Sequence, residues 1–352
     1  MTLTTALAIL GALVLAVVIA HGAWQARKAS PRQADSSKDA SQDGGVRLDP
    51  TLTDASVSAT AASVADAAHD LRMPGLRKLS ARLDPLIDAV APITLEAPVS
   101  GEMALSNLPP SRRAGSKPFL IEGLNTETGE WELPMPLQRY GEFQAGVQMA
   151  NRSGALNEIE FSEFVQKLQA FADGVGGMLE VPDMLDVVGR ARELDGFAGG
   201  HDAQLAVALR ANGAAWSVGY IQQMAGRRGF VPGALPGRLV LPAAEDGAPP
   251  VLVLAFDAQA ALAEDPHISS VREATLSLDV PQTAEGAEPF PAWHDAARTL
   301  AADMDATMMD GQGRPITLHA FAAIGADLTL LYRALESRDL AAGSLVARRL
   351  FS

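Results

Sequence analysis

Large apolar residues alternate with small or polar ones in several short segments of the chain. The hexapeptide QLAVAL at Gln204–Leu209 places Leu, Val and Leu on one side and Gln, Ala and Ala on the other. A period of two predicts a strand whose large side chains face a core. The same pattern predicts two sets of strands: Ile93–Leu95, Phe119–Leu124, Glu130–Leu133 and Phe143–Met149; then Gln204–Leu209, Arg238–Leu241, Val251–Phe256 and Thr275–Val280.

Segments with helical periodicity lie between and after these strands. Apolar residues recur there at intervals of three and four, which is typical of a helix with one buried face. Two of the predicted helices begin after a capping residue, Asp183 or Thr317. The predicted helices are Glu163–Val175, Asp183–Leu194, Ser217–Arg227, Pro291–Met304 and Thr317–Leu335. The sequence therefore predicts an α+β protein with antiparallel sheets and helices on one face of each.

The two sets of elements repeat each other. In each set a strand leads through a polar loop to a long helix, then to a short apolar strand and a second helix. Five apolar positions of the first long helix match five of the second at one constant offset, as a duplicated domain predicts. The matched positions are Phe161, Phe164, Leu168, Phe171 and Val175 in the first helix, and Phe290, Trp293, Ala297, Leu300 and Met304 in the second.

The segment Leu3–Ala20 carries no charged residue. About 18 residues in a helix span roughly 27 Å, close to the hydrocarbon thickness of a bilayer. Trp24 follows at an interfacial position, and Arg27 and Lys28 lie just beyond it. Positive charge after the apolar run predicts a retained transmembrane helix with a periplasmic N-terminus and a cytoplasmic body. The alternative is a cleaved signal peptide, which is expected to carry its positive charge before the apolar run.

The chain of 352 residues is predicted to divide into four parts. Residues 1–28 form the anchor and the juxtamembrane motif. Residues 29–79 are rich in Ser, Asp and Ala and have few bulky apolar residues, so we expect a flexible linker. Residues 80–200 and 201–352 would then be the two related folded units.

Charge and composition narrow the classes of function. A net charge of −14 disfavours nucleic acid as a partner, because phosphate binding needs a basic surface. The absence of cysteine excludes thiolate metal sites and fits a reducing compartment. The glycine-rich segments Gly174–Gly177 and Gly311–Gly313 predict a helix stop and a hairpin turn, since neither follows a strand and opens a helix. No catalytic triad or histidine metal site is evident, so we expect neither enzymatic activity nor a cofactor.

The juxtamembrane residues His21, Gly22, Trp24, Arg27 and Lys28 match a His-Gly-x-Trp-x-x-Arg-Lys pattern. This pattern resembles the one that follows the membrane anchor of the ZipA family, whose members tie the tubulin-like division protein FtsZ to the bacterial inner membrane. Further matches to the family's C-terminal domain occur in order along the chain, at Arg228–Val231, Leu278–Pro281, Phe290–Ala306 and Met309–Thr317, with a related helix end at Phe171–Gly177.

The resemblance implies a cell-division protein at the inner membrane of the division site. Members of the family bind the C-terminal tail of FtsZ as a short peptide on the sheet face that helices leave uncovered. Carried over strand by strand, the peptide-binding positions are Ala206, Ala208, Leu239, Ala255, Thr275, Ser277 and Arg314. Most of these are small or polar where the family has large Met and Phe side chains. The position in the second strand is ambiguous by one residue.

Three alternatives remain open at this stage. A strand phase shifted by one residue would present the large residues instead, namely Leu205, Val207, Leu252, Leu254, Leu276 and Leu278. A membrane-anchored scaffold of the same fold could bind a different division or envelope protein. A sheet of this kind also suits base stacking in RNA-binding modules, although the inferred face has no aromatic residue.

Overall fold

The computed structural model describes residues 83–352 except 246, 264, 266–268 and 317. The predicted anchor, the juxtamembrane motif, the linker and the cap at Thr317 lie outside the described residues. Within the described residues the chain is an α+β protein with antiparallel sheets and eight α-helices. None of those helices is both long and apolar enough to cross a bilayer. The described chain forms two compact units, one ending at Gly200 and the other spanning His201–Phe351.

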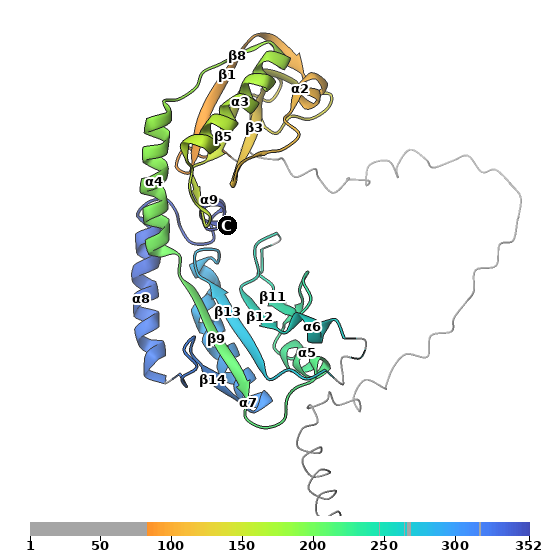
Figure 1. Cartoon of the computed structure of the whole chain (residues 1–352), viewed down its shortest axis with the longest axis vertical. Helices are drawn as coiled ribbons and strands as arrows, with labels where there is room; N and C mark the ends of the chain where they lie inside the picture. The colour runs from red at the N-terminus through yellow and green to blue at the C-terminus, as the bar shows by residue number, and fades with distance from the viewer. Residues whose placement is uncertain (1–82, 246, 264, 266–268, 317) are drawn as a thin grey trace, which may run out of the picture. The chain divides into compact units, whose positions relative to one another are not determined.

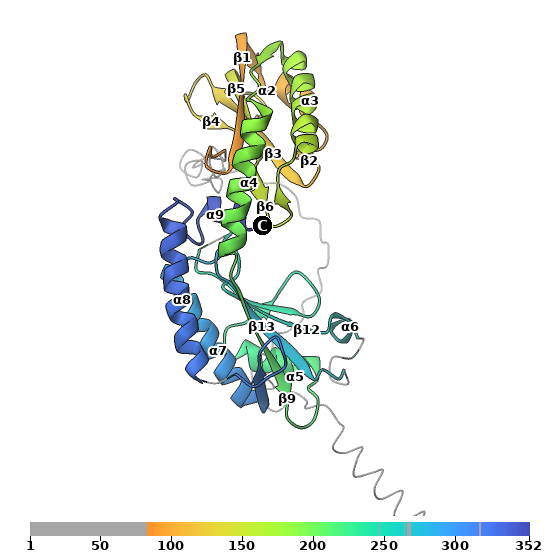
Figure 2. The same cartoon turned by 60° about the vertical axis from the view of Figure 1, so that its left-hand side comes forward.

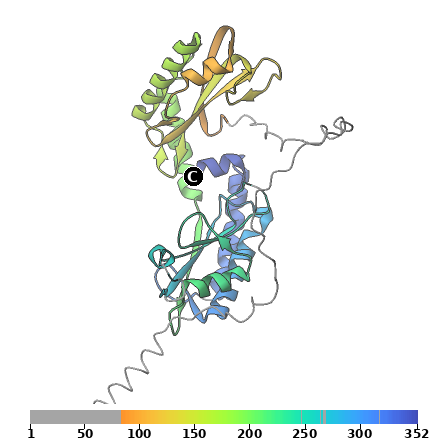
Figure 3. The same ribbon diagram turned by 90° about the vertical axis from the view of Figure 1, so that its right-hand side faces the viewer.

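The N-terminal unit contains one main antiparallel sheet with strand order β2-β3-β5-β1-β8, with β4 added on β3 (Figure 1). Helix α3 lies against one side of this sheet (Figure 3). The elements are β1 Asp88–Ser100, α2 Gly101–Asn107, β2 Arg113–Ala114, β3 Lys117–Asn125, β4 Trp131–Glu132, β5 Arg139–Gln148, β6 Ala150–Asn151, β7 Gly154–Ala155, α3 Glu158–Val175, β8 Gly177–Leu179 and α4 Met184–His201.

The C-terminal unit contains a six-stranded antiparallel sheet with strand order β10-β11-β12-β13-β9-β14. Helices α7 and α8 lie side by side in this unit (Figure 2). The elements are β9 Gln204–Ala211, α5 Val218–Gly226, β10 Val231–Pro232, β11 Arg238–Leu241, β12 Leu252–Phe256, α6 Ala258–Ala261, β13 Glu273–Asp279, the 3-10 helix η1 Glu285–Ala287, α7 Pro289–Met304, β14 Ala306–Met309, α8 Leu318–Glu336 and α9 Leu345–Leu350.

The two sheets share one connectivity. The first strand of each unit, β1 or β9, lies between the strand before the long helix and the strand after it, which are β5 and β8 or β13 and β14. A short helix follows each first strand, and a second long helix follows each edge strand. Beyond β5 and β13 each sheet has three more strands, but their arrangement differs: β2 and β4 both pair with β3, whereas β12, β11 and β10 follow one another in line. The common order of elements agrees with the repeat in the sequence.

The matched apolar stripes of the long helices face the cores. On α3 all five stripe residues are at most 4% exposed, and Phe164 and Phe171 make edge contacts with Phe119 and Phe143 at ring-centroid distances of 5.5 and 5.2 Å. On α7 the stripe is likewise buried, except that Phe290 is half-buried. The helical phase predicted from the sequence is therefore confirmed.

The helix ends follow their local chemistry. Asn157 and Glu160 form a reciprocal capping box at the start of α3, and Gly176 ends this helix in the left-handed region at a φ of 68°. The Asp183 carboxylate accepts a hydrogen bond from the backbone of Asp186, so it caps α4 as predicted. Gly313 likewise has a φ of 73° in the turn after β14. The segment Gly174–Gly177 thus ends a helix, and the segment Gly311–Gly313 forms a turn, as predicted.

Candidate functional site

One face of the C-terminal sheet is packed against helices. The core of this unit joins the sheet to residues of α5, α7 and α8, including Ile221, Trp293 and Leu328. Six large strand residues on this side are at most 1% exposed: Val207, Leu209, Leu252, Leu254, Leu276 and Leu278. The strand phase predicted from the alternation is confirmed, and the alternative phase that would expose these side chains is wrong.

The opposite face carries two rows of residues across four strands, and most of their side chains are small. The pairing of β11, β12, β13 and β9 fixes their order. The first row runs Val240, Val253, Ser277 and Ala206, and the second runs Arg238, Ala255, Thr275 and Ala208. Five residues predicted from the sequence, Ala206, Ala208, Ala255, Thr275 and Ser277, therefore lie together on one surface. Below, the open face denotes these two rows.

Leu239 does not belong to this surface. Its side chain is 3% exposed, and the residue pairs with Leu254 on the helix-covered side. The residues of β11 on the open face are Arg238 and Val240. The prediction failed here because a strand of four residues with three consecutive apolar side chains has no unambiguous alternation. Its phase is set by pairing with β12, which the sequence does not specify.

A hollow of about 300 Å³ lies at one end of the open face. Strand residues form its floor, and two consecutive prolines in the loop before β12 line it as well. The lining residues include Gln204, Arg238, Pro249, Pro250, Val253, Ala255, Ser277 and Asp279. The hollow is therefore built from both predicted residues and residues that the sequence reasoning missed. The loop prolines could not be placed from the sequence, because no periodicity connects a loop to a sheet face.

The two arginines near this sheet differ in their partners. Arg314 is exposed in the turn after β14, where its Nη2 lies 3.1 Å from Oδ2 of Asp310. Hydrogen bonds from the Arg314 backbone N–H, and then from Gln312, hold the pKa of Asp310 below its ordinary value, against a smaller opposing effect of burial. Arg238 lines the hollow, and its guanidinium makes no ion pair or hydrogen bond to any residue in the described part of the chain. Arg238 is thus the cation available at the open face.

An ion pair lies at the end of the open face opposite the hollow. Arg210 and Glu273 face each other across β9 and β13, with Nη2 and Oε2 2.9 Å apart. This ion pair is half exposed and separates the two rows from the loop at the end of β9. The open face is therefore bounded by an ion pair at one end and by the hollow at the other.

The corresponding face of the N-terminal sheet is partly covered by the chain itself. Leu83 lies over Gly146, where an added Cβ would come within 2.5 Å of its Cδ2 atom. The backbone N–H of Leu83 donates to Oε1 of Glu122 at 3.3 Å, and Gln144 donates to Oε2 at 3.1 Å. Glu122 is fully buried on this face. Of the two helix-free faces, the C-terminal one is the more accessible.

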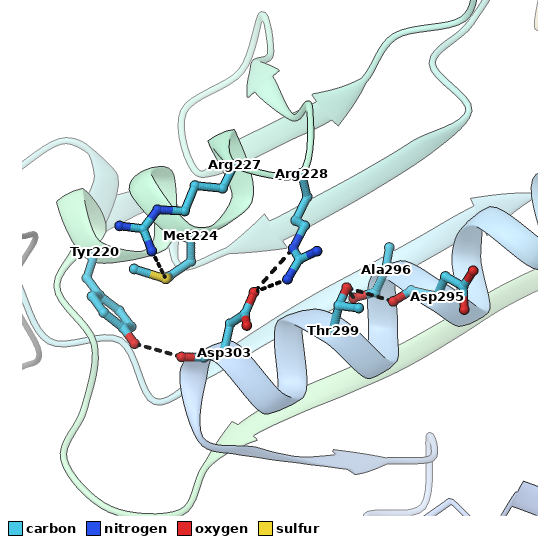
Figure 4. Close-up of polar contacts among 8 residues, drawn as sticks. All are labelled: Tyr220, Met224, Arg227, Arg228, Asp295, Ala296, Thr299 and Asp303. Carbon is cyan, nitrogen blue, oxygen red and sulfur yellow. Dashed lines mark hydrogen bonds and ion pairs between the residues drawn. The ribbon is translucent and has the colours of Figure 1, made fainter.

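Polar contacts join the helices that pack behind the open face. In Figure 4, Tyr220 on α5 and Arg228 just after α5 both reach Asp303 in the last turn of α7.

Within the described range of residues, no three side chains of the metal-binding type lie close enough to hold an ion. Compared with known proteins, the chain matches no protein-family model and no curated protein.

Proposed function

We propose that this protein binds the C-terminal tail peptide of FtsZ on the open face and holds FtsZ filaments at the cytoplasmic side of the inner membrane. The observation that carries the proposal is the helix-free sheet face of the C-terminal unit, with its hollow at the Arg238 end. The sequence resemblance to the ZipA family names the partner. The two units would then be divergent copies of the split βαβ domain of that family.

The geometry of the open face suits a short peptide. Four strands spaced about 4.8 Å apart make a surface roughly 14 Å across, which is the length of about four residues of an extended segment or about nine residues of a helix. The small side chains of Ala206, Ala255 and Ser277 leave the peptide's own side chains room to approach the backbone of the sheet. Apolar side chains of the peptide would contact Val240 and Val253, and its terminal part would enter the hollow.

Arg238 gives this surface one local attraction for an acidic peptide. The chain as a whole carries a net charge of −14, which opposes an acidic partner at long range. An unpaired guanidinium in the hollow can bind a carboxylate of the peptide directly. We therefore assign the contact with an acidic peptide to Arg238 rather than to Arg314, a peptide-binding position by the sequence resemblance that pairs with Asp310 instead.

Tethering needs no catalytic group. A receptor held at the membrane by the predicted anchor Leu3–Ala20 confines its partner to a thin layer. A filament engages many receptors at once, so a modest affinity of each site is sufficient. No cofactor is required for this mechanism, and the proposal assigns no enzymatic activity.

A binding experiment with a matched control tests the proposal. The full chain is titrated into a fluorescently labelled FtsZ tail peptide, and anisotropy is measured. Ala255→Glu places a bulky anion in the middle of the open face and should weaken binding by about tenfold or more, a loss of roughly 1.4 kcal/mol. Ala322→Glu makes the same change at an exposed position of α8 and should leave binding unchanged.

Equal binding by wild type and Ala255→Glu would contradict the assignment of the open face. No binding of the peptide by the wild type would favour the alternative, a scaffold of the same fold with another division or envelope partner. In cells, a fluorescent fusion should form a mid-cell ring that disappears when residues 1–28 are removed.

A further inference from the structure

The helix-free face of the N-terminal sheet carries large apolar side chains that are partly exposed. Strand pairing places one row of residues across β4, β3, β5, β1 and β8, in the order Trp131, Leu124, Glu142, Thr94 and Met178. Trp131 and Leu124 are half-buried, and Met178 is 74% exposed. Exposed apolar side chains grouped on one surface are typical of a contact with another segment or another molecule.

Two neighbouring rows extend this surface. They add the half-buried apolar residues Leu120 and Val90 and the carboxylate of Glu122. The carboxylate of Glu142 is exposed and makes no ion pair or hydrogen bond to any residue in the described part of the chain. Below, the N-terminal face denotes the row from Trp131 to Met178 together with these residues. It is an apolar surface that carries negative charge.

The chain enters its folded part over this face. The side chain of Leu83 lies over Gly146, and its backbone N–H donates to Oε1 of Glu122 at 3.3 Å. This N–H belongs to the peptide bond that joins Leu83 to residue 82, so the chain arrives at Leu83 above the sheet and not from beyond its edge. The turn that follows is held in place, since the N–H of Asp84 donates to Oδ2 of Asp88 at 2.8 Å.

The segment that arrives there has a composition complementary to the N-terminal face. Residues 71–82 read LRMPGLRKLSAR and lie outside the described residues. They contain four Arg or Lys residues and no Asp or Glu, in a chain whose net charge is −14. Their large apolar residues are Leu71, Met73, Leu76 and Leu79. The segment therefore offers apolar side chains to an apolar surface and cations to its unpaired carboxylate.

We propose that residues 71–82 bind to the N-terminal face of their own chain. Because the segment is already joined to Leu83, docking costs only the ordering of a short stretch of chain, and modest contacts are sufficient. An extended chain of this length spans roughly 40 Å, whereas five strands cover about 19 Å, so the segment can cross the whole face. The tether to the predicted anchor then ends near residue 70. This inference does not depend on what the open face binds.

Hydrogen exchange of the full chain, followed by mass spectrometry, tests the proposal. Backbone amides of residues 75–82 should exchange about tenfold or more slowly, relative to the rates of an unstructured chain, than those of residues 40–60. Equal relative rates in the two segments would overturn the proposal and would leave the N-terminal face to another occupant.

Charge reversal on the face gives a matched pair of variants. Glu142→Lys should raise the exchange rates of residues 75–82 about fivefold, since an exposed attraction for Arg and Lys is lost. Glu193→Lys makes the same change at an exposed position of α4 and should leave these rates unchanged. The amides of β5 should stay slow in both variants, which would show that the unit remains folded. Unchanged rates in Glu142→Lys would overturn the assignment of the segment to this face.

A change in the segment itself separates its release from unfolding. Leu79→Asp lies outside the described unit and should remove most of the protection of residues 75–82, because it places an anion against an apolar and acidic surface. Leu52→Asp makes the same change within the predicted linker and should have no effect on these amides. Full protection in Leu79→Asp would overturn the proposal.

Discussion

Arg228 donates two hydrogen bonds to a single carboxylate oxygen of Asp303, from Nε at 3.2 Å and from Nη2 at 2.6 Å (Figure 4). The backbone carbonyl of the same aspartate accepts a hydrogen bond from the Tyr220 hydroxyl at 3.0 Å. One residue at the end of α7 therefore joins α5 and the segment that follows it to the helix layer behind the open face.

These contacts predict a modest loss of stability on mutation. Asp303→Asn should lower the free energy of unfolding by about 0.5–1 kcal/mol, since the pair is partly exposed and screened by water. Tyr220→Phe should cost about 1 kcal/mol for one hydrogen bond. Urea denaturation of Arg228→Gln, Asp303→Asn and the double variant would give the coupling energy. If the effects of the two single variants add up exactly in the double variant, the contact between Arg228 and Asp303 does not contribute to the free energy of unfolding.

Gly101 at the start of α2 is predicted to be intolerant of any side chain. A Cβ at this position would overlap the carbonyl oxygen of Met135, which belongs to a neighbouring backbone segment and cannot rotate away. Gly101→Ala should therefore lower the free energy of unfolding by about 2 kcal/mol or more. Gly189 in α4 has open space around it. Gly189→Ala should leave the free energy of unfolding unchanged or raise it by up to about 1 kcal/mol. Thermal melts of the two variants and the wild type check both expectations.

Acid stability should depend on Glu160. Burial alone would raise the pKa of this carboxyl, but hydrogen bonds from Ser116 and Asn157 and the charge of Lys117 outweigh it, so its pKa lies below the ordinary 4.5. The unfolded chain therefore binds this proton more readily. The contribution of Glu160 to the free energy of unfolding is fully present above about pH 4.5, the pKa of the unfolded state. It is lost as the pH falls through the lower pKa of the folded state.

A stability profile between about pH 2 and 7 checks this sign. Glu160→Gln should be less stable at neutral pH, because the capping box with Asn157 and the bonds to Ser116 depend on the carboxylate. Its profile should also be flatter below pH 4.5. An unchanged acid slope would mean that other carboxyl groups carry the dependence.

The affinity for the FtsZ tail peptide should respond little to salt. Contacts on the open face are mostly apolar, and Arg238 supplies only one charge. Raising ionic strength from about 0.05 to 0.3 M should therefore change the dissociation constant by less than about threefold. Arg238→Gln should remove most of that small dependence. Loss of binding over a small rise in salt would indicate long-range attraction instead.

Sequence reasoning succeeded where one periodicity extends over many residues. The stripe from Phe161 to Val175 and the alternation in β9 and β13 each repeat often enough to fix a phase. Those phases follow from burial of one face, which is a local property of the sequence. The alternation alone therefore places Ala206 and Ser277 on the side of their strands that faces away from the core.

Features that depend on pairing or on a few residues were not predicted. The phase of Leu239 depends on its neighbour strand, and helices α2 and α9 have only seven and six residues. The position of Leu83 over Gly146 and the row from Trp131 to Met178 join elements that are distant in the sequence. Nothing in the local pattern of either partner specifies such contacts.

The position of Leu83 over Gly146 would limit the number of partners that one molecule of the proposed receptor can bind. Two equally bare sheets would let one molecule grip two neighbouring filaments and cross-link them. With the first sheet partly covered by its own chain, each molecule would offer the open face of the C-terminal unit as its main docking surface. If the proposed function holds, one such receptor would recruit filaments without cross-linking them, and lateral bundling would require receptors to associate with one another.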